Sequence, residues 1–410
     1  MNDIINALRQ NIISYKNKRY IVAGAVQFRS IWIRDTGFCA DILNELGYSD
    51  IIENTVRLYI QNLIKDSRGY LYGPKCFDSM NPEWRTVKMS IRHLFGLVRQ
   101  SDPIDDLQPC MYKDSRDSIA IDSNILMCLA ALHTPLIHTA KWKRIFPKMI
   151  RWYKTNNQGL VIQNAFSDFK DSQRREGLVF HINLLYYVCL EKYSHLGYST
   201  PALVGKTLSE LKTNIIKTFW NTKKGLFMSQ KGLRYICLLD NLQAIKYKLV
   251  PTRTNTRTNT RTNLDESTST STSTSPHLST LVSTQEHYQN LKKSKLWMHS
   301  KLRVPGFATY PQYEDIHIQV QFGGLKNYHN DLYWYWLMAY AGITSIEMGD
   351  KEEGKRIWNI LKLMAKRDGT VGEIYKPETG FPLFETATYM SEKPFTLAAC
   401  YGAKLKKYLS

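Results

Sequence analysis

The stretch "RSIWIRDTGFCADIL", residues 29–43, places the adjacent charges of Arg34 and Asp35 inside an apolar run, with Trp32 two positions before the arginine. Burying an ion pair removes two charges from water, and this cost consumes most of the attraction between them. A contribution to the stability of the fold is therefore a weak explanation for a buried Arg–Asp pair. An Arg–Asp pair can instead bind neighbouring sugar hydroxyls, while a Trp face packs on the ring. The alternative is a structural salt bridge at a helix start, with Asp35 near the helix dipole.

Around this stretch, apolar residues recur at roughly 3.6-residue spacing over most of the chain. The spacing predicts helices at 2–14, 37–47, 49–64, 89–99, 121–132, 138–153, 181–192, 202–219, 238–249, 284–297, 330–348, 350–366 and 396–409. The best strand candidate is "IHIQVQF" at 316–322. So many helices joined by long connections predict an all-α fold of paired helices wrapped into a closed ring. A helical-repeat solenoid is the competing fold, but the sequence shows no repeat period to support it.

One segment, "TRTNTRTNTRTNLDESTSTSTSTSP" at 252–276, repeats a T-R-T-N unit and then alternates Ser and Thr. So polar a tract cannot bury enough apolar surface to offset the entropy that is lost on ordering. We predict a disordered, low-complexity surface insertion within one domain that spans residues 1–410. A linker between two domains is the alternative.

The formal net charge of +19 raises the question of nucleic-acid binding. The Lys and Arg residues are spread along the whole chain and form no long run, which is more typical of a solvated basic surface. We therefore do not expect nucleic acid as the partner.

The cysteines and the apolar segments indicate the cellular setting. The seven cysteines are scattered, odd in number and without a C-x-x-C pair: Cys39, Cys76, Cys110, Cys128, Cys189, Cys237 and Cys400. Their spacing argues against a disulfide framework and a zinc site, and predicts a reducing, cytoplasmic compartment. No apolar run approaches the roughly 18 residues of a membrane span, and the N-terminal stretch lacks the apolar core of a secretory signal.

A second candidate segment is "NAFSDFKDSQRREGLVFHINLLYYVCL", 164–190. Asp168 and Asp171 precede its apolar helix, and they would share a face if their own stretch were helical. A cap or turn role is the ordinary alternative for either aspartate.

Two more segments carry polar groups beside aromatic residues. In "GLKNYHNDLYWYWLMAYAGI", 324–343, His329, Asn330 and Asp331 lie at the head of an aromatic helix, where a structural histidine and an N-cap aspartate are the alternatives. In "DGTVGEIYKPETGFPLFETATYMSEKPFTLAACYGA", 368–403, Glu373 lies in a Gly-flanked loop next to Tyr375. The rival carboxylates are Glu378 and Glu385, and a surface position is the alternative for each.

In this order, the four segments resemble the six-hairpin glycosidases, whose catalytic domain is an (α/α)6 toroid. The likeness is to the glucosidase domain of glycogen-debranching enzymes and to neutral/alkaline invertases, and it runs from about residue 20 to residue 403. "IWIRDTGF" is similar to the W-x-R-D motif that lines the sugar subsite at Trp32, Arg34 and Asp35. "IAIDSNILMCLAAL" resembles the V-D-S/A segment through Asp122 and Ser123.

The resemblance also selects a catalytic pair. The general-acid motif ahead of an E-I-x-A-L-x-Y helix is similar to "FKDSQRREGLVFHINLLYYVCL" and selects Asp171 over Asp168. The base motif, P-E-Y-Y with a later T-W-S/T-L-A helix, resembles "GEIYKPETG … PFTLAAC" and selects Glu373. The invertase-type H-N segment resembles "YHNDLYWYWLMAYAGI".

Three positions depart from the family pattern. Phe169 stands where the family has Trp before the acid, His181 replaces the Glu of the E-I-x-A-L helix, and Leu397 replaces the Trp after the last Thr. These departures bear on the sugar that is recognised rather than on the catalytic pair.

The resemblance implies an inverting glycoside hydrolase, similar to amylo-α-1,6-glucosidases, with Asp171 as general acid and Glu373 as general base. Inversion requires the two carboxyl groups to lie roughly 6.5–9.5 Å apart. A protonated Asp171 would need a raised pKa, from an apolar wall of Phe166 and Phe169 or from the charge of Asp168. α-Glucosidic substrates are the first expectation and sucrose-like β-fructosides the second. No metal or organic cofactor is implied.

The other predicted substrate-binding residues follow from the same resemblance. Hydroxyls would be held by Arg34, Asp35 and His329, stacking surface would come from Trp32, Tyr328 and Trp334, and the pocket would be completed by Asp122, Asp168, His181 and Asp331. Two alternatives remain open. A non-catalytic relative would bind carbohydrate without turnover, and a basic helical scaffold would bind nucleic acid in a salt-dependent manner.

Overall fold

The computed structural model describes residues 2–97, 101–111, 120–199, 206–251, 276–298, 304–305, 307–316, 328–375 and 392–410. The Thr/Ser/Arg tract at 252–275 and most of the predicted strand at 316–322 lie outside these residues. Of that strand, Ile316 is described, and it forms an isolated antiparallel bridge with Gln173.

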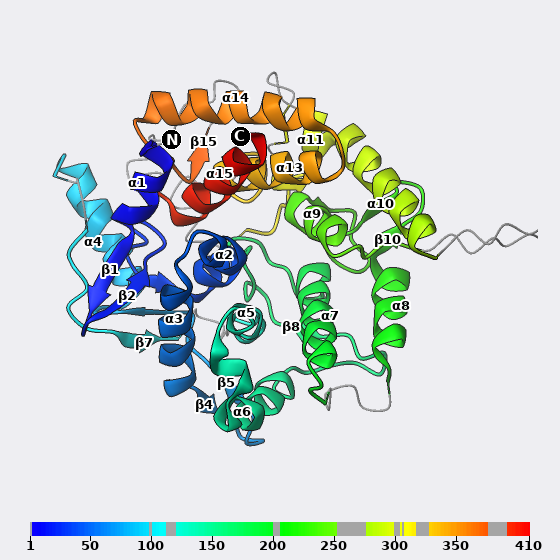
Figure 1. Ribbon diagram of the computed structural model, residues 1–410, viewed down its shortest axis with the longest axis horizontal. Coiled ribbons are helices and arrows are strands. Elements are labelled where there is room, and N and C mark those ends of the chain that lie inside the picture. Colours follow the sequence, from blue (N-terminus) through cyan, green and yellow to red (C-terminus); the bar gives the residue numbers. More distant parts are fainter. Residues whose placement is uncertain are drawn as a thin grey trace, which may run out of the picture.

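An inner ring of six helices forms the centre of the described part of the chain (Figure 1). They are α2 (Ile33–Glu45), α5 (Ser123–Ala131), α7 (Phe180–His195), α9 (Leu238–Lys246), α13 (Tyr335–Glu347) and α15 (Thr396–Leu409). Each contacts the next in this order, and α15 returns to α2. Helices α7 and α13 are buried on nearly every side, which explains why their sequences are apolar all round. The predicted all-α closed ring is confirmed.

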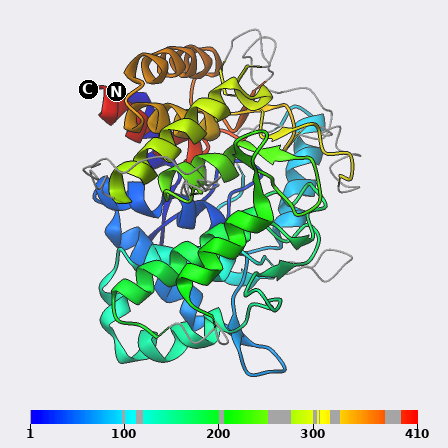
Figure 2. The same cartoon turned by 90° about the vertical axis from the view of Figure 1, so that its right-hand side faces the viewer.

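Each inner helix packs against one outer helix. The outer helices are α1 (Asn2–Gln10), α3 (Ser49–Gln61), α6 (Ala140–Ile150), α8 (Leu208–Phe219), α10 (Pro276–Lys293) and α14 (Lys351–Asp368). They pair with α15, α2, α5, α7, α9 and α13, respectively. The hairpin of α1 and α15 joins the two ends of the chain, which lie close together in both ribbon views (Figures 1 and 2).

Short antiparallel strands occupy the connections. The pairs are β1 (Ile12–Tyr15) with β2 (Lys18–Ile21), β4 (Ile64–Lys65) with β5 (Leu71–Tyr72), β8 (Ile162–Gln163) with β9 (Gly177–Leu178), β10 (Trp220–Asn221) with β11 (Leu226–Phe227), β12 (Ile236–Cys237) with β13 (Thr309–Tyr310), and β14 (Tyr333–Trp334) with β15 (Ile374–Tyr375). A three-stranded sheet has the order β3 (Ile31–Trp32), β6 (Cys76–Asp78), β7 (Gln108–Cys110). Strands β3, β12 and β14 lead directly into α2, α9 and α13, so they fix where these inner helices begin.

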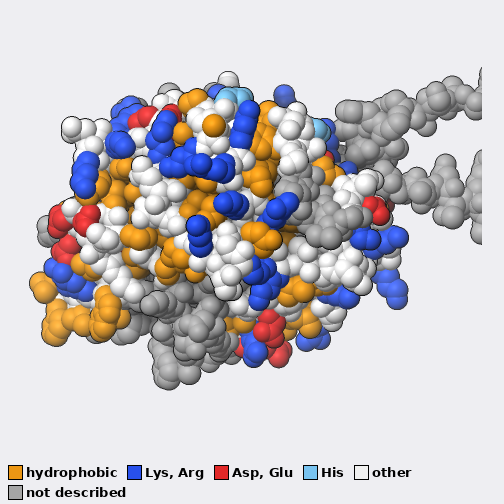
Figure 3. Space-filling view, turned by 90° about the horizontal axis from the view of Figure 1, so that it is seen from below, with side chains coloured by type: hydrophobic (Ala, Val, Ile, Leu, Met, Phe, Trp, Pro, Cys, Tyr) orange, Lys and Arg blue, Asp and Glu red, His pale blue; other side chains and the backbone are white. Residues whose placement is uncertain are grey.

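The helix α4 (Pro82–Leu94) lies beside the ring and leaves an apolar stripe in solvent. Trp84, Val87 and Ile91 are exposed on it, and Phe95 follows at its end. Apolar side chains gather at the left of Figure 3, the side on which Figure 1 places α4, while Lys and Arg side chains are dispersed over the face in view. Arg85 anchors the helix through two hydrogen bonds of 2.5 and 2.8 Å to the buried Asp78.

Several helix boundaries differ from the predictions, among them the start of α2 at Ile33 instead of residue 37. The first helix ends at Gln10, because the chain then turns into the β1–β2 hairpin. Helix α4 begins at Pro82 instead of residue 89, since proline fits the first turn of a helix. The predicted helix at 284–297 is two helices, α10 and α11 (Lys295–Met298). A short 3₁₀ helix, η1 (Pro135–His138), precedes α6.

Within the described residues, no helix is both long and apolar enough to cross a membrane.

The close packing of α2 on α5 gives a stability prediction. A Cβ atom on Gly37 would lie 2.6 Å from the Cβ of Leu126. Although alanine favours helix formation, we expect Gly37→Ala to lower the free energy of unfolding by about 1–3 kcal/mol because the added methyl overpacks this contact. Gly402→Ala in α15 is the control, since its nearest neighbour would be 3.3 Å away. Urea unfolding measures both, and a Gly37→Ala protein as stable as the wild type would contradict the packing argument.

Candidate active site

The inner helices begin at one end of the ring, which we call the mouth. Arg34 in the first turn of α2 donates from Nε to both oxygens of Asp122, the residue before α5, at 3.0 and 2.8 Å. His181 in the first turn of α7 lies 3.6 Å from Asp240 in the first turn of α9, between Nδ1 and Oδ1. Tyr335, the first residue of α13, donates its backbone N–H to the Glu373 carbonyl at 3.1 Å. The segments singled out in the sequence therefore converge here.

Arg34 is the centre of one side of the mouth. Besides Asp122, its guanidinium donates to Asp171 Oδ2 at 2.9 Å and to the Ser167 carbonyl at 3.0 Å. Arg34 is 8% exposed and Asp122 is fully buried, whereas the Asp171 side chain is 28% exposed. Arg34 thus ties the start of α2 to the start of α5 and to the loop that carries Asp171.

Asp35 links this side of the mouth to Glu373. Burial and, to a smaller extent, the charge of Glu373 raise the pKa of Asp35 to about 7, although the charge of Arg34 opposes both. The Asp35 Oδ1 atom is buried and has no hydrogen-bond partner among the described residues. Burial likewise raises the pKa of Asp122 to about 6, against the charge of Arg34. The mouth therefore holds carboxyl groups that change charge near neutral pH.

Glu373 is held rigidly at the other side of the mouth. Its side chain is 1% exposed, and the hydroxyl of Tyr328 donates to Oε1. The backbone N–H of Glu392 donates to Oε2 at 3.4 Å. The backbone of Glu373 is fixed as well, because its N–H donates to the Glu392 carbonyl at 3.0 Å.

Glu392 is a residue of the mouth that sequence reasoning missed. Its carboxylate accepts the backbone N–H groups of Val26, Gln27 and Phe28, the last two at 2.7 and 3.0 Å. Burial raises its pKa to about 7 despite these donors, and the charge of Glu373 adds to the effect. The sequence places Glu392 in "SEKPF", just before the last helix, which is a position where a site residue could have been suspected. Its partners could not be inferred, because the N-terminal loop that it binds is distant in the chain.

Aromatic rings surround this carboxylate pair. Trp334 stacks on His329 with centroids 5.0 Å apart and packs edge-on against Tyr328 at 4.7 Å. The Nε1 of Trp334 donates to the Tyr328 carbonyl at 2.7 Å, and His329 bonds to the Ser172 hydroxyl. Trp334 and His329 are buried, so Tyr328, which is half-buried, is the member of this cluster with surface to offer a ligand.

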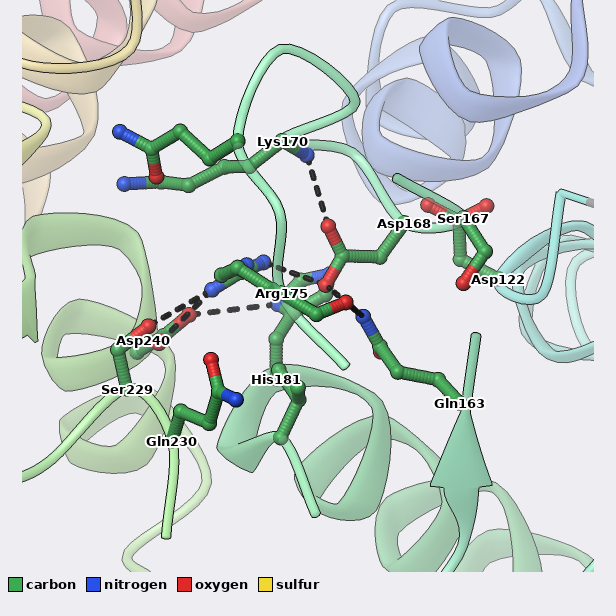
Figure 4. A network of polar contacts seen from close by, with 12 residues as sticks. Asp122, Gln163, Ser167, Asp168, Lys170, Arg175, His181, Ser229, Gln230 and Asp240 are labelled. Carbon is green, nitrogen blue, oxygen red and sulfur yellow. Dashed lines mark hydrogen bonds and ion pairs between the residues drawn. The ribbon is translucent and has the colours of Figure 1, made fainter. Parts of the chain in front are cut away.

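A buried charge network lies beside the mouth, and Figure 4 shows Arg175 between Asp168 and Asp240. Arg175 bonds to Asp168 at 2.6 Å and lies 3.5 Å from Asp240. Although burial opposes ionisation, Arg175 and His181 lower the pKa of Asp168 to about 2. Burial lowers the pKa of His181 to about 3. Asp168 and His181 are both inaccessible to solvent, so they support the mouth rather than face it.

The structure brings together most of the predicted site residues but changes some of their roles. Arg34 pairs with Asp122 and Asp171, so the Arg34–Asp35 segment is not a self-contained salt bridge. Asp168 forms a buried ion pair with Arg175 at 2.6 Å. Trp32 is half-buried beside Phe28, with centroids 6.1 Å apart. Asp331 accepts from Gln312 at 2.7 Å. The rivals Glu378 and Glu385 lie outside the described residues.

A cavity of about 600 Å³, a volume that includes space open to solvent, lies along the ring. Later turns of the inner helices line it, including Phe38, Leu126, Leu185, Gln243, Tyr340 and Tyr401. The catalytic candidates Asp171 and Glu373 do not line this cavity, because they lie in the connections that precede α7 and α15. Among the described residues, no group of three or more His, Cys, Asp and Glu side chains is arranged to hold a metal ion.

The buried Asp35 gives a pH prediction. Its pKa is about 7 in the folded protein and near 3.8 when unfolded. Between pH 5 and pH 7 the unfolded chain has therefore already lost this proton, while the folded chain still largely holds it. This difference destabilises the wild type as the pH rises. We expect the stability of Asp35→Asn relative to the wild type to increase by about 2 kcal/mol from pH 5 to pH 7. Urea unfolding at the two pH values measures it.

The exposed Asp105→Asn serves as the control for this experiment and should show no such change. A relative stability of Asp35→Asn that stays constant or falls over this range would contradict the burial of a protonated Asp35.

Comparisons with known proteins identify the fold. No family model matches the sequence, and no curated protein matches it significantly. Among solved structures, the chain is similar to the rhamnosidase from Klebsiella oxytoca with rhamnose bound, at a TM-score of 0.58 and 11% identity, over 100% of this chain and 63% of that one. It therefore spans less than two thirds of the rhamnosidase.

Two further structures match over a larger share of their own length. The GH63 mannosylglycerate hydrolase from Thermus thermophilus in complex with glucose has a TM-score of 0.56 and 12% identity, over 98% of this chain and 99% of that one. Hormoconis resinae glucoamylase has a TM-score of 0.56 and 11% identity, over 99% and 72%. This chain has the (α/α)6 toroid fold that the six-hairpin glycosidases share.

Proposed function

We propose that this chain is an inverting glycoside hydrolase, with its active site at the mouth, Asp171 as general acid and Glu373 as general base. One observation carries the proposal. Asp35 is subject to the charges of both Glu373 and Arg34, and Arg34 binds Asp171 directly. The two candidate carboxylates thus flank one Arg–Asp unit, although they come from loops far apart in the sequence. Such a carboxylate pair is the general requirement for glycoside hydrolysis.

Asp171 has the exposure that a general acid needs. Its Oδ2 is held by Arg34, and its side chain is 28% exposed. Arg34 makes two hydrogen bonds to the fully buried Asp122 and one to Asp171. In this proposal, Asp171 delivers a proton from its other oxygen, Oδ1, to the leaving oxygen of a bound glycoside.

Glu373 has the orientation that a general base needs. The Tyr328 hydroxyl and the Glu392 backbone N–H each hold one carboxylate oxygen. Burial and the charge of Glu373 raise the pKa of the neighbouring Asp35 to about 7, so Asp35 is protonated over much of the range below pH 7. It would take a proton from a water molecule that attacks the anomeric carbon from the face opposite the acid.

The substrate in this proposal is an oligosaccharide or glucoside. Trp32 and Tyr328 are half-buried and can stack on a sugar ring, while Arg34 and Asp35 reach its hydroxyls. A glucoamylase and a glucose complex among the structural neighbours support α-glucosides as the first substrates to test. Sucrose-like β-fructosides are the second choice.

The catalytic pair is tested by Asp171→Asn and Glu373→Gln. Each removes one proton-transfer group at nearly constant shape, so we expect hydrolysis to fall at least about a hundredfold, with the circular-dichroism spectrum unchanged. The assay follows reducing sugar released from a panel of oligosaccharides and aryl glucosides. Glu352→Gln makes the same chemical change on the exposed face of α14 and should keep full activity.

Retained hydrolysis in either variant would refute the assignment of that residue. Sugar binding by calorimetry without turnover in the wild type would support the non-catalytic alternative instead.

A further inference from the structure

The cysteines are far apart in the sequence but lie in pairs in the fold. All seven belong to the described residues, and none of them forms a disulfide bond in the structure. Six of them have another cysteine side chain as an interacting neighbour, in the pairs Cys39–Cys400, Cys76–Cys110 and Cys128–Cys189. The sequence spacing could not reveal this arrangement, because each pair joins different elements of the fold.

The first pair spans two adjacent strands. Cys76 of β6 and Cys110 of β7 are directly opposite one another in the antiparallel register. Opposite residues in such a ladder have Cα atoms about 4.5–5.5 Å apart, within the range that a disulfide bond spans. Cys76 is also directly opposite Trp32 of β3, so this pair lies in the sheet that supports the mouth.

The other two pairs join neighbouring helices of the inner ring. Cys39 of α2 meets Cys400 of α15, and these two helices pack together where the first and last parts of the chain close the ring. Cys128 of α5 meets Cys189 of α7, which are also packed neighbours. All four thiols are completely buried.

Cys237 is the internal control. Its neighbours are Lys170, Arg175 and Asp240 rather than another thiol. The structure therefore divides the cysteines into three pairs and one single residue.

We propose that Cys76–Cys110, Cys39–Cys400 and Cys128–Cys189 are three disulfide-forming sites and that Cys237 stays reduced. The oxidant is a small-molecule disulfide. One cysteine thiolate attacks it and releases a small thiol, which gives a mixed disulfide. The partner thiolate then attacks the protein sulfur of the mixed disulfide and releases a second small thiol. Two protein thiols lose two electrons and two protons, and one small disulfide becomes two small thiols.

The burial of the thiols sets an order of reaction. Cys110 is partly exposed, whereas the other five paired cysteines are buried. Burial raises the pKa of the Cys39, Cys76 and Cys128 thiols well above the usual value, so these buried thiols offer little thiolate in the folded protein. Cys110 is the paired thiol that a dissolved disulfide can reach, because it is partly exposed. The Cys76–Cys110 bond therefore forms first in the folded protein. The two helix pairs need refolding or transient opening of the ring.

The test is peptide mapping of the full chain by mass spectrometry under non-reducing conditions, after exposure to mixtures of oxidised and reduced glutathione. In the folded protein we expect the Cys76–Cys110 linkage to appear first. After refolding in the same mixture, we expect all three linkages, a fall in titratable thiols from seven to one, and a higher Tm.

Two variants make the result specific. Cys237→Ser should leave all three linkages and no free thiol. Cys400→Ser should lose one linkage and leave Cys39 and Cys237 free, with the other two bonds unchanged. Linkages between other cysteines, or seven free thiols after refolding under oxidising conditions, would overturn the proposal whether or not the chain hydrolyses glycosides.

Discussion

The buried guanidinium of Arg34 is the interaction on which the mouth of the ring depends. It leaves the first turn of α2 and binds Asp122 before α5, Asp171 in the next connection and the Ser167 carbonyl. An uncompensated charge at such a depth costs several kcal/mol, so these partners must stay where they are for the ring to remain closed at this end. The position of Asp171 is a consequence of this constraint.

The charges of the molecule form two groups, a basic surface and a set of buried carboxyl groups at the mouth. The chain carries a net charge of +19, with Lys and Arg dispersed over the face seen in Figure 3. The mouth instead gathers Asp35, Glu373 and Glu392, three buried carboxyl groups that affect one another's ionisation. Because like charges in a buried site cannot all ionise near neutral pH, some of these groups keep a proton while others carry the charge. Proton transfer to and from a substrate needs such a division.

Local sequence patterns were sufficient for the framework of the fold. Helical periodicity predicted the inner helices, and the charged pair in "IWIRDTGF" pointed to the start of α2, where Arg34 is now seen at the centre of a network. Long-range contacts were beyond such patterns. The binding of Glu392 to the N-terminal loop, the compensation of Asp168 by Arg175 and the pairing of the thiols all join residues that are brought together by closure of the ring. The ion pair between Asp168 and Arg175 is one such contact, and no pattern in the sequence marked Arg175 as the partner.

The central claim is that Asp171 and Glu373 act on opposite faces of a sugar across the mouth. It is tested most directly by proton NMR of the first product that the wild-type chain releases from a glycoside of defined anomeric configuration, recorded before mutarotation. The account predicts that the product first appears with the opposite anomeric configuration. First appearance with the configuration of the substrate would contradict it, because that result requires a covalent intermediate and a different use of these carboxylates.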